Sequence, residues 1–544
     1  MQFNLADLFE LVADTVPDRV AVVCAGDRLT YAALDHLSTR VAHALGNRGA
    51  GASEHVALYM RNSVDHLAAI LACYKLRAVP INVNYRYVDE ELDYLLIDAD
   101  AIGVVADSGV SERAQRVVGN GPEAAFVVDV DSGAFASELQ HASTARDFEP
   151  RSGDDHYVLY TGGTTGLPKG VMWRHEDIFF GAMGGGNPGG PPIARPEDIA
   201  ASVVENPAQR LNAFLGQSDP QPAQFVSLAL GPLMHASGQW SAIGTLLGGG
   251  KVVLYDRPHV EMDYVLELVE REGVNAMNLV GDASARPLLA ALSGNGPRRD
   301  LSSLLLLGSG GSILSGDAKQ DLMTALPSVR AIVEGIGSSE SPAQAVAVTT
   351  RDGAAKGSRS LTFAAKAETI VVDDELRAVP RGSGVVGRLA TRGRVPLGYY
   401  KDAERSARTF VEIDGQRWSL PGDMATIDED GTVHLLGRGS MCINTGGEKV
   451  YPEEVEAVLK CHADIEDAVV VGAPDPQFGQ RVVAIVATSP GRPAPDLAAL
   501  QDHCRAHLAG YKVPRAVHVV KEVARTPAGK ADYAWAREIA VGPD

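Results

Sequence analysis

A glycine- and threonine-rich stretch with a single lysine, YTGGTTGLPKGV at residues 160–171, has the residue types of a phosphate-binding loop. Glycines let the backbone approach a phosphate, amides and hydroxyls can donate hydrogen bonds to it, and lysine adds positive charge. In the large NTPase class a lysine directly follows the second glycine, whereas here Pro168 separates Gly166 from Lys169. A solvated turn has a similar composition, so the stretch alone leaves both interpretations open. The residues of this stretch that could bind the phosphate are Thr161, Gly163, Thr164, Thr165 and Lys169.

Further short motifs with small, polar or charged residues lie downstream of this loop. Several follow apolar runs that read as strands, such as FVSLALGPL before His235. Ligands gather at the carboxyl ends of strands in open α/β sheets, so these positions are suited to a binding site. The motifs are PLMHASG (232–238), GSGGS (308–312), IGSSE (336–340), PGD (421–423), GRGS (437–440), TGGEK (445–449) and TPAGK (526–530).

Three side chains in these motifs have the chemistry of a nucleotide or acyl site. Asp423 could accept hydrogen bonds from both hydroxyls of a ribose, or it could cap a turn. Glu340 offers the oxygen ligands that Mg²⁺ prefers, although a lone glutamate in a Gly/Ser segment is usually just exposed. His235 could face a site at the end of its strand, or it could be a hydrogen-bonded core histidine, and the residues leave both open.

In this order, the loop and the motifs resemble the signature motifs of the adenylate-forming superfamily, which includes acyl-CoA synthetases, peptide-synthetase adenylation domains and beetle luciferases. The resemblance covers nearly the whole chain. It implies that the loop cradles the β- and γ-phosphates of ATP while a carboxylate attacks the α-phosphate. It also implies ATP, Mg²⁺ and CoA as the small molecules that the protein binds beside its carboxylic acid.

The resemblance implies a role for each motif. Asp423 would hold the ribose and Glu340 would hold Mg²⁺, while His235 would border the acyl carboxylate and the route of the thiol. Lys530 would stabilise the charge that develops as the carboxylate attacks ATP. The TGGEK stretch would border the pantetheine tunnel after the tail has turned about Ser440. The other residues implied in nucleotide, acyl or CoA binding are Gly310, Ile336, Gly337, Ser339, Arg438, Gly446, Gly447 and Lys449.

The chain departs from the family pattern at four positions. Gly162 stands where Ser or Thr is usual, Ile336 where an aromatic ring stacks on adenine, and Ser339 where Thr is usual. Ser440 occupies the hinge, where Asp or Lys is common. The first three lie on the ATP side, which motivates the hypothesis that thioester formation is the stronger half-reaction.

The predicted function is a carboxylic acid–CoA ligase that forms an acyl-AMP and then transfers the acyl group to CoA. The departures, with MWRHED, GGEKVYPEEVE and AGYKVP, resemble actinobacterial ligases for steroid side-chain acids and related ligases of terpenoid antibiotic pathways. The glycines of GSGGS either leave volume for such a bulky polycyclic acid or reflect tight backbone packing.

Other functions stay open on the motifs. One is a thioesterification-only enzyme that takes acyl-AMP from a partner adenylating enzyme, and another is a non-catalytic protein that binds an acyl-adenylate. A luciferase-like oxygenase has the same motifs. A peptide-synthetase adenylation domain would need an acidic partner for the substrate amine, which GPLMHASGQW lacks.

The elements that position these motifs follow an α/β pattern. Helical periodicity followed by a short apolar strand occurs twice in residues 31–84, which predicts mostly parallel sheets with helices on their faces. From about residue 365 glycines become frequent and strands shorten, indicating a β-rich subdomain. We therefore predict a large N-terminal domain of several subdomains at residues 1–437 and a small, mobile α+β C-terminal domain at residues 438–544. Residues 184–224, rich in Gly and Pro, read as a surface excursion or lid.

The composition suits a soluble chain of two or three domains, with 544 residues, 45% hydrophobic and 22% charged. A net charge of −20 argues against a nucleic-acid or anionic-membrane surface. The five cysteines are scattered without metal-ligand or redox spacing. We see no signal peptide and no apolar run of the ~20 residues that span a bilayer, so we expect a cytoplasmic protein and leave its oligomeric state open.

Overall fold

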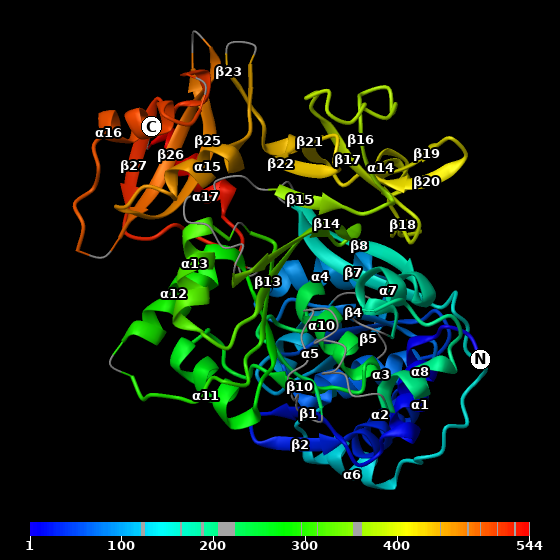
Figure 1. Ribbon diagram of the computed structural model, residues 1–544. Coiled ribbons are helices and arrows are strands. Elements are labelled where there is room, and N and C mark those ends of the chain that lie inside the picture. The colour runs from blue at the N-terminus through cyan, green and yellow to red at the C-terminus, as the bar shows by residue number, and fades with distance from the viewer. Residues whose placement is uncertain are drawn as a thin grey trace. The chain divides into compact units, whose positions relative to one another are not determined.

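The computed structural model of the chain describes residues 1–120, 126–163, 166–186, 190–204, 224–294, 296–312, 314–351, 362–445, 448–475, 478–489, 491–508, 510–526 and 529–542 (Figure 1). The chain divides into two compact units. The first comprises Met1–Asn278, Arg299–Leu305 and Arg394–Phe410. The second comprises Leu279–Arg298, Leu306–Gly393 and Val411–Asp544.

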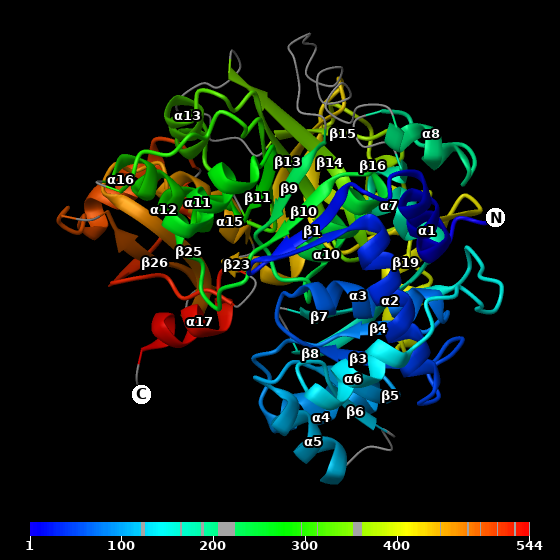
Figure 2. The same cartoon turned by 90° about the horizontal axis from the view of Figure 1, so that it is seen from below.

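The first unit contains a parallel four-stranded sheet in the order β4-β3-β5-β6. All five residues of β3 are buried, as expected for a strand with both faces covered. Helices α3, α4 and α5 pack against its strands (Figure 2). The bounds are β3 (His55–Tyr59), α3 (Val64–Lys75), β4 (Val79–Asn82), α4 (Asp89–Asp98), β5 (Ala101–Ala106), α5 (Ser111–Asn120) and β6 (Phe126–Asp129). The predicted alternation of helices and parallel strands is confirmed here.

A second group of strands in this unit has the order β2-β1-β10-β9-β11 and is parallel except for the β1–β2 hairpin. Helix α10 contacts both β9 and β10, and it begins within the PLMHASG motif, directly after His235. The bounds are β1 (Val20–Cys24), β2 (Asp27–Thr30), β9 (Val226–Ala229), α10 (Ala236–Leu247), β10 (Lys251–Leu254), α11 (Met262–Glu272) and β11 (Ala276–Leu279).

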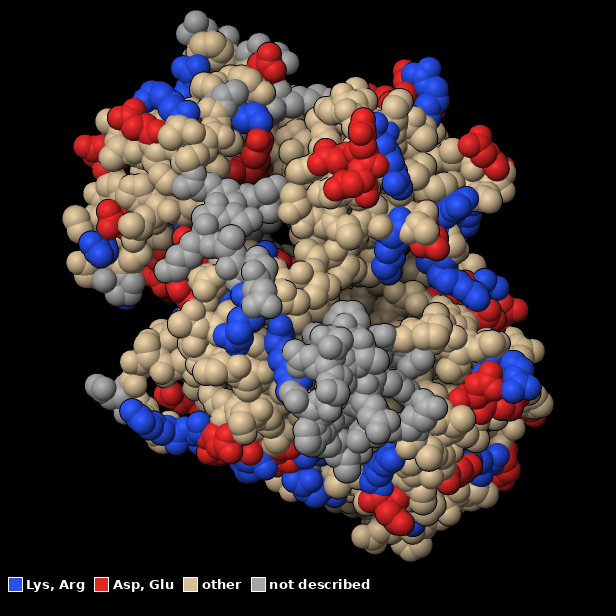
Figure 3. Space-filling view, in the orientation of Figure 1, with Lys and Arg blue, Asp and Glu red and all other residues tan. Residues whose placement is uncertain are grey.

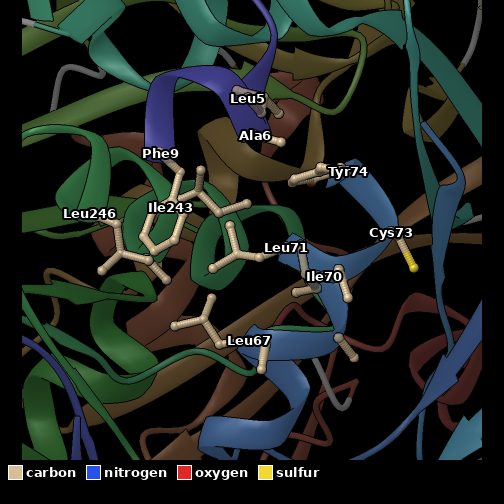
Figure 4. Close-up of a cluster of buried hydrophobic side chains, with 14 of the residues drawn as sticks. Leu5, Ala6, Phe9, Leu67, Ile70, Leu71, Cys73, Tyr74, Ile243 and Leu246 are labelled. Atoms are coloured by element: carbon tan, nitrogen blue, oxygen red, sulfur yellow. The ribbon is translucent and has the colours of Figure 1, made fainter. Parts of the chain in front are cut away.

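The core of the first unit forms where three helices meet. Leu5 and Phe9 of α1 (Leu5–Thr15) face Leu67 and Leu71 of α3 and Ile243 of α10 (Figure 4). All five side chains are essentially inaccessible to solvent. Burying a large apolar side chain stabilises a fold by roughly 1.5–3 kcal/mol, so this contact fixes α10 and therefore the position of His235 at its start.

The glycine- and threonine-rich loop connects two antiparallel strands. β7 (His156–Gly163) and β8 (Gly166–Arg174) pair along their length, and the short strand β18 (Gly398–Tyr399) adds to β8. The strand predicted before the loop is therefore present. The loop continues into a hairpin rather than into a helix, so its lysine lies on a strand.

The second unit begins with two helices and a set of strands. β12 and β13 are parallel, and the remaining strands follow mostly antiparallel in the order β13-β14-β15-β22-β21-β17-β20-β19, with β16 beside β17. The predicted β-rich region after residue 365 is confirmed. The bounds are α12 (Gly281–Ser293), β12 (Leu306–Gly310), α13 (Gly316–Ala325), β13 (Ala331–Ser338), β14 (Ser341–Thr350), β15 (Thr362–Ala365), β16 (Thr369–Val372), β17 (Gly387–Arg392), β19 (Phe410–Ile413), β20 (Gln416–Ser419), β21 (Asp423–Ile427) and β22 (Thr432–Arg438).

The end of the chain is an α+β segment, as predicted. Its sheet has the order β24-β23-β26-β25, with β27 parallel to β26. The long strands β25 and β26 are largely apolar and buried, and α15 and α17 pack on β25. The bounds are β23 (Ile443–Thr445), β24 (Glu448–Val450), α15 (Pro452–Leu459), β25 (Ile465–Asp475), β26 (Gly479–Thr488), α16 (Leu497–Arg505), β27 (Ala516–Val520) and α17 (Tyr533–Val541).

Two expectations about organisation stay predictions. One is the domain boundary at residue 438, and the other is the lid at 184–224, where α8 (Asp198–Val204) is described but residues 205–223 lie outside the described part. Within the described ranges, every helix is too short or too polar to cross a bilayer.

Candidate active site

Two residues from the sequence motifs meet at paired strand ends in the second unit. Asp423 is the first residue of β21 and Arg438 is the last residue of β22, and the antiparallel register places them opposite each other. Nε of Arg438 lies 3.2 Å from Oδ1 of Asp423. The carboxylate is buried, with a side chain that is 9% exposed, whereas that of Arg438 is 35% exposed. The contact is therefore a partly buried ion pair.

The carboxyl group of Asp423 retains capacity to accept hydrogen bonds. Its Oδ2 is buried and has no hydrogen-bond partner among the described residues. Burial raises the pKa of Asp423, while Arg438 lowers it, Glu340 raises it and Lys530 lowers it. An unsatisfied buried oxygen is costly, so a ligand hydroxyl bound there would offset a penalty already present in the fold.

Lys530 reaches the same charged cluster from the other end of the second unit. Burial lowers its pKa and Arg438 lowers it further, whereas Glu340 and Asp423 raise it. Its side chain lies over the GSGGS turn, where a Cβ on Gly311 would be 3.6 Å from Cε of Lys530. The structure thus brings together four motif residues that are far apart in the sequence: Asp423, Arg438, Glu340 and Lys530.

Glu340 lies between β13 and β14 and is held by its backbone. Its amide donates to Oγ of Ser338 at 3.2 Å, and its carbonyl accepts from Oγ of Ser419 at 2.9 Å. It is 6% exposed. The described residues contain no group of three His, Cys, Asp or Glu side chains that could hold a metal ion. Mg²⁺ usually takes only one or two carboxylates and completes its shell with water and phosphate, so a single buried carboxylate such as that of Glu340 suits it.

The remaining residues of IGSSE and GSGGS lie on the adjacent strands β12 and β13 or directly after them. Gly310 pairs with Gly335, and Ile336 packs in an apolar cluster with Ala345, so the side chain predicted to meet adenine is largely within the core. Gly337 must be glycine, because a Cβ there would lie 2.2 Å from the carbonyl oxygen of Pro342. Ser339 is partly exposed beside Glu340.

In the first unit, the loop lysine lies against a tyrosine that the sequence reasoning did not identify. Nζ of Lys169 donates to the hydroxyl of Tyr399 at 3.2 Å and lies 4.2 Å from its ring centroid. Tyr399 is buried on β18, which pairs with β8, and the ring of Phe410 packs beside it. The only sequence signal was the aromatic pair GYY at residues 398–400.

Other predicted residues of the loop are placed only in part. Thr161 pairs with Lys169 and Gly163 with Gly166 across the hairpin, while Thr164 and Thr165 lie outside the described residues. His235 is the residue before α10, and its amide donates to the carbonyl of Pro232 at 2.9 Å. It is partly exposed, as a histidine at a site would be.

The TGGEK stretch is also described only in part. Gly446 and Gly447 lie outside the described residues, and Lys449 lies on β24, where it pairs with Asn444. The roles predicted for this stretch, and those of the other site residues, stay predictions.

Glu453 is a second residue that the sequence reasoning missed. It comes from the first turn of α15, and its Oε1 accepts a 3.4 Å hydrogen bond from the amide of Arg438. A Cβ on Gly437 would lie 2.0 Å from its Oε2, and Gly437 has a φ of 120°, so this position requires glycine. Burial and the neighbouring Glu456 raise the pKa of Glu453 to about 8. The signal in the sequence was the PEEVE motif at residues 452–456.

Outside these clusters, many charged residues lie on the surface and some, such as Lys75, are buried. On the face shown in Figure 3, acidic and basic side chains are interspersed.

The sequence matches two adjoining families. Residues 9–400 match the family described as AMP-binding enzyme, and residues 454–530 match the AMP-binding enzyme C-terminal domain. The first match covers more than half of the chain.

Curated relatives match over nearly their whole length. The "Medium/long-chain-fatty-acid–CoA/3-oxocholest-4-en-26-oate–CoA ligase" of Mycolicibacterium smegmatis is 42% identical over 554 residues, covering 99% of this chain and 97% of the relative. The "3-oxocholest-4-en-26-oate–CoA ligase" of Rhodococcus rhodochrous is 40% identical over 554 residues, covering 99% of this chain and 96% of the relative.

Solved structures share the fold. The anthranilate CoA ligase AuaEII in complex with anthranoyl-AMP superimposes with a TM-score of 0.82, covering 99% of this chain and 98% of that one at 23% identity. At this identity the likeness shows the fold alone, and it confirms the predicted α/β class.

Proposed function

The chain belongs to the AMP-binding enzyme family and is an acyl-CoA ligase that works through an acyl-adenylate, and we propose that its acid is bulky and polycyclic, of the steroid or terpenoid class. The carboxylate first attacks the α-phosphate of ATP, forming acyl-AMP and releasing pyrophosphate. The thiolate of CoA then attacks the acyl carbon and displaces AMP. The thioesterification-only and non-catalytic alternatives are not retained, because the relatives are named as CoA ligases over almost the full length.

The observation that carries the site assignment is the charged cluster of Asp423, Arg438, Glu340 and Lys530. In our proposal Oδ2 of Asp423 accepts a ribose hydroxyl, because it is buried with no partner among the described residues. Arg438 holds the other oxygen of that carboxylate and faces the ribose or the phosphate. The pair would thus fix the nucleoside before the chemistry begins.

The first step places negative charge on the oxygens of the transferring phosphate. Lys530 would stabilise this charge through an electrostatic contact to the transition state. Lys169 would contact the β- and γ-phosphates, with Tyr399 setting the position of its ammonium. Glu340 would hold Mg²⁺, which would neutralise the triphosphate when bound.

The second step requires a path for the thiol. We propose that the tail turns about Ser440, so that Lys530 leaves the site and the TGGEK stretch lines the pantetheine path. His235, at the start of α10, would border the acyl carboxylate and this path. One site would thereby serve both half-reactions.

The acid class is supported by the relatives and by one feature of the GSGGS turn. Gly311 has a φ of 77°, so its lack of a side chain follows from its backbone conformation. Gly310 has no such constraint, since a Cβ there would meet only the carbonyl oxygen of Gly335 at an ordinary 3.8 Å. Its missing side chain therefore leaves room that packing does not require, as a bulky acid needs.

A panel of acids tests the proposal. The enzyme would be given ATP and CoA with 3-oxocholest-4-en-26-oic acid, a diterpenoid acid, a long-chain fatty acid or a small aromatic acid, and acyl-CoA and pyrophosphate would be quantified. We expect the largest kcat/KM with a polycyclic acid. A preference for the fatty acid would overturn the substrate class and leave the ligase activity intact.

A further inference from the structure

The loop that carries Lys530 is anchored to the rest of the tail by a charged network. It lies between β27 and α17, and its backbone closes on itself, since the amide of Thr526 donates to the carbonyl of Lys530 at 2.7 Å and the amide of Gly529 donates to the carbonyl of Thr526 at 2.8 Å. These bonds shape the loop, but they do not fix where it lies relative to the sheet.

Arg525 fixes the position of this loop relative to the sheet. Its Nη1 donates to the carbonyl of Gly529, the residue before Lys530, at 3.3 Å. Its Nη2 forms an ion pair with Oδ2 of Asp467 on β25. The Arg525 and Asp467 side chains are 15% and 18% exposed, so water competes weakly for them. One planar guanidinium thus connects the loop backbone to a buried strand, a fork geometry that a lysine cannot reproduce.

Asp467 is held in turn from a third element. Its Oδ1 pairs with Nζ of Lys460 at 3.1 Å, and that lysine side chain is 3% exposed at the end of α15. Although burial raises the pKa of Asp467, Lys460 and Arg525 together bring it below its usual value. The carboxylate is therefore charged at neutral pH, with each oxygen committed to one cation.

We propose that Arg525 and Asp467 are positioning residues for the adenylation step, which hold Lys530 at the charged cluster of Asp423 and Arg438. The inference rests on the role of Lys530 in the proposed function. A misplacement of about 1 Å can cost 10²-fold in rate, so a brace that fixes the loop carrying Lys530 is consequential. Val280 also borders the loop, since a Cβ on Gly529 would lie 3.0 Å from Cγ1 of Val280.

The same tail contains a matched ion pair that lacks the connection to the loop. Nζ of Lys512 lies 2.6 Å from Oε1 of Glu454, and the two side chains are 18% and 26% exposed. Neutralising this carboxylate with Glu454→Gln removes a comparable pair without touching the loop backbone. It therefore controls for the general effect of losing a half-buried ion pair in the tail.

The test compares the two half-reactions in Asp467→Asn and Glu454→Gln. Acyl-AMP formation would be followed in single turnovers with saturating ATP and acid, and thioester formation would be followed from synthetic acyl-AMP and CoA. We expect Asp467→Asn to slow acyl-AMP formation at least 10-fold, with the KM for ATP and the CoA step within about twofold of the parent. Glu454→Gln should leave both steps unchanged. Equal slowing of both steps by Asp467→Asn would overturn the proposal.

A double-mutant comparison separates positioning from stability. In a Lys530→Ala background, Asp467→Asn should have no further effect on acyl-AMP formation, because there is no lysine left to position. A full additional loss there would contradict the proposal. If Asp467→Asn does not fold, Arg525→Lys replaces it, since it keeps the charge but cannot reach both the Gly529 carbonyl and Asp467.

The role of Lys530 is tested independently. If Lys530→Ala leaves acyl-AMP formation intact, the proposed function of that lysine is wrong. If Lys530→Ala abolishes the step while Asp467→Asn and Arg525→Lys do not, only the positioning role is wrong.

Discussion

Nε of Arg438 lies 3.2 Å from one carboxylate oxygen of Asp423, while the other oxygen is buried and without a hydrogen-bond partner among the described residues. The arrangement orients the carboxylate and leaves one acceptor for a ligand. Because Lys530 and Glu340 belong to the same charged cluster, a nucleoside bound to Asp423 would place its phosphate beside a cation.

Asp423→Ala should weaken the binding of acyl-AMP by roughly 1.5–3 kcal/mol, the scale of a hydrogen bond to a charged group. Isothermal calorimetry with a non-hydrolysable acyl-AMP analogue measures this directly. Asp430→Ala is the matched control, because that carboxylate lies exposed in the turn between the same two strands. An affinity for the analogue that is the same in Asp423→Ala and Asp430→Ala would remove Asp423 from the ribose site.

Lys530→Ala should slow acyl-AMP formation by about 10²–10³-fold, the usual loss when one well-placed electrostatic contact to a transition state is removed. Transfer of the acyl group from preformed acyl-AMP to CoA should be spared, since no phosphoryl group is transferred in that step and Lys530 has left the site in the proposed mechanism. Rapid-quench measurement of each half-reaction separates the two. Equal rate losses in acyl-AMP formation and in acyl transfer to CoA would contradict the proposed exchange of Lys530 for the TGGEK stretch between the two steps.

Gly447→Leu should produce the opposite pattern. Gly447 lies outside the described residues, and the prediction follows from the sequence, where a branched side chain in TGGEK would obstruct the path of the thiol. We expect pyrophosphate release in the absence of CoA to stay at the parent rate, while thioester formation falls at least 10-fold, the order of loss expected for a misplaced reactant. An unchanged CoA step would place the thiol path elsewhere.

Lys75→Met should destabilise the first unit by roughly 3 kcal/mol, the lower end of the range for breaking a buried pair. Nζ of Lys75 lies 2.7 Å from carboxylate oxygens of both Glu10 and Asp35 and is fully buried. The loss stays at the lower end because Arg151 and Arg146 continue to pair with these carboxylates. Thermal melting measures the change.

The control for Lys75 is Lys401→Met, which breaks an exposed pair in the same unit. Nζ of Lys401 lies 2.6 Å from Asp100, and the two side chains are 45% and 59% exposed. Such a pair contributes less than about 1 kcal/mol. If Lys75→Met and Lys401→Met lower the melting temperature by the same amount, burial does not determine how much the Lys75 ion pairs stabilise the fold.

Glu453→Gln should flatten the dependence of tail stability on pH. The pKa of Glu453 is about 8 in the folded chain against a usual 4.5, so the folded state binds the proton more tightly than the unfolded state. Its contribution to stability is fully present below pH 4.5 and is lost as the pH rises through 8. The melting temperature of the parent should therefore fall over this window more than that of the variant.

Glu454→Gln, one residue along α15, is the control for this effect. Its carboxylate pairs with Lys512 and is 26% exposed, so this variant measures the effect of removing a carboxylate from α15 outside the buried position of Glu453. Parallel pH profiles for the parent and Glu453→Gln would show that Glu453 is ionised in the fold.

The chemistry of the protein could be predicted from the sequence because the family motifs are short and contiguous. Each motif can be recognised from its own residues, without knowledge of the rest of the chain, as in the loop at residues 160–171, PGD and TPAGK. The parallel sheets and the α+β tail could also be predicted, since apolar periodicity is a local signal. The order of the motifs along the chain identified the family, and the family implies the two half-reactions.

Contacts between distant segments were decided by the tertiary structure alone. Asp423 and Arg438 meet because β21 and β22 pair in one register, and Tyr399 meets Lys169, 230 positions away in sequence, because β18 adds to β8. Ile336 packs in an apolar cluster with Ala345 through strand pairing that no local pattern reveals, and its contact with adenine stays a prediction.

The contacts of Glu453 and Arg525 also could not be predicted from the sequence. In the sequence each is a charged residue beside a known motif, with nothing to distinguish it from a solvated side chain. Whether such a residue is buried, and which group it meets, depends on how helices and strands pack, and that packing sets its pKa and its partners. Residue types therefore determined which reaction this protein can perform, whereas only the three-dimensional arrangement decided which charges hold its reactive groups in place.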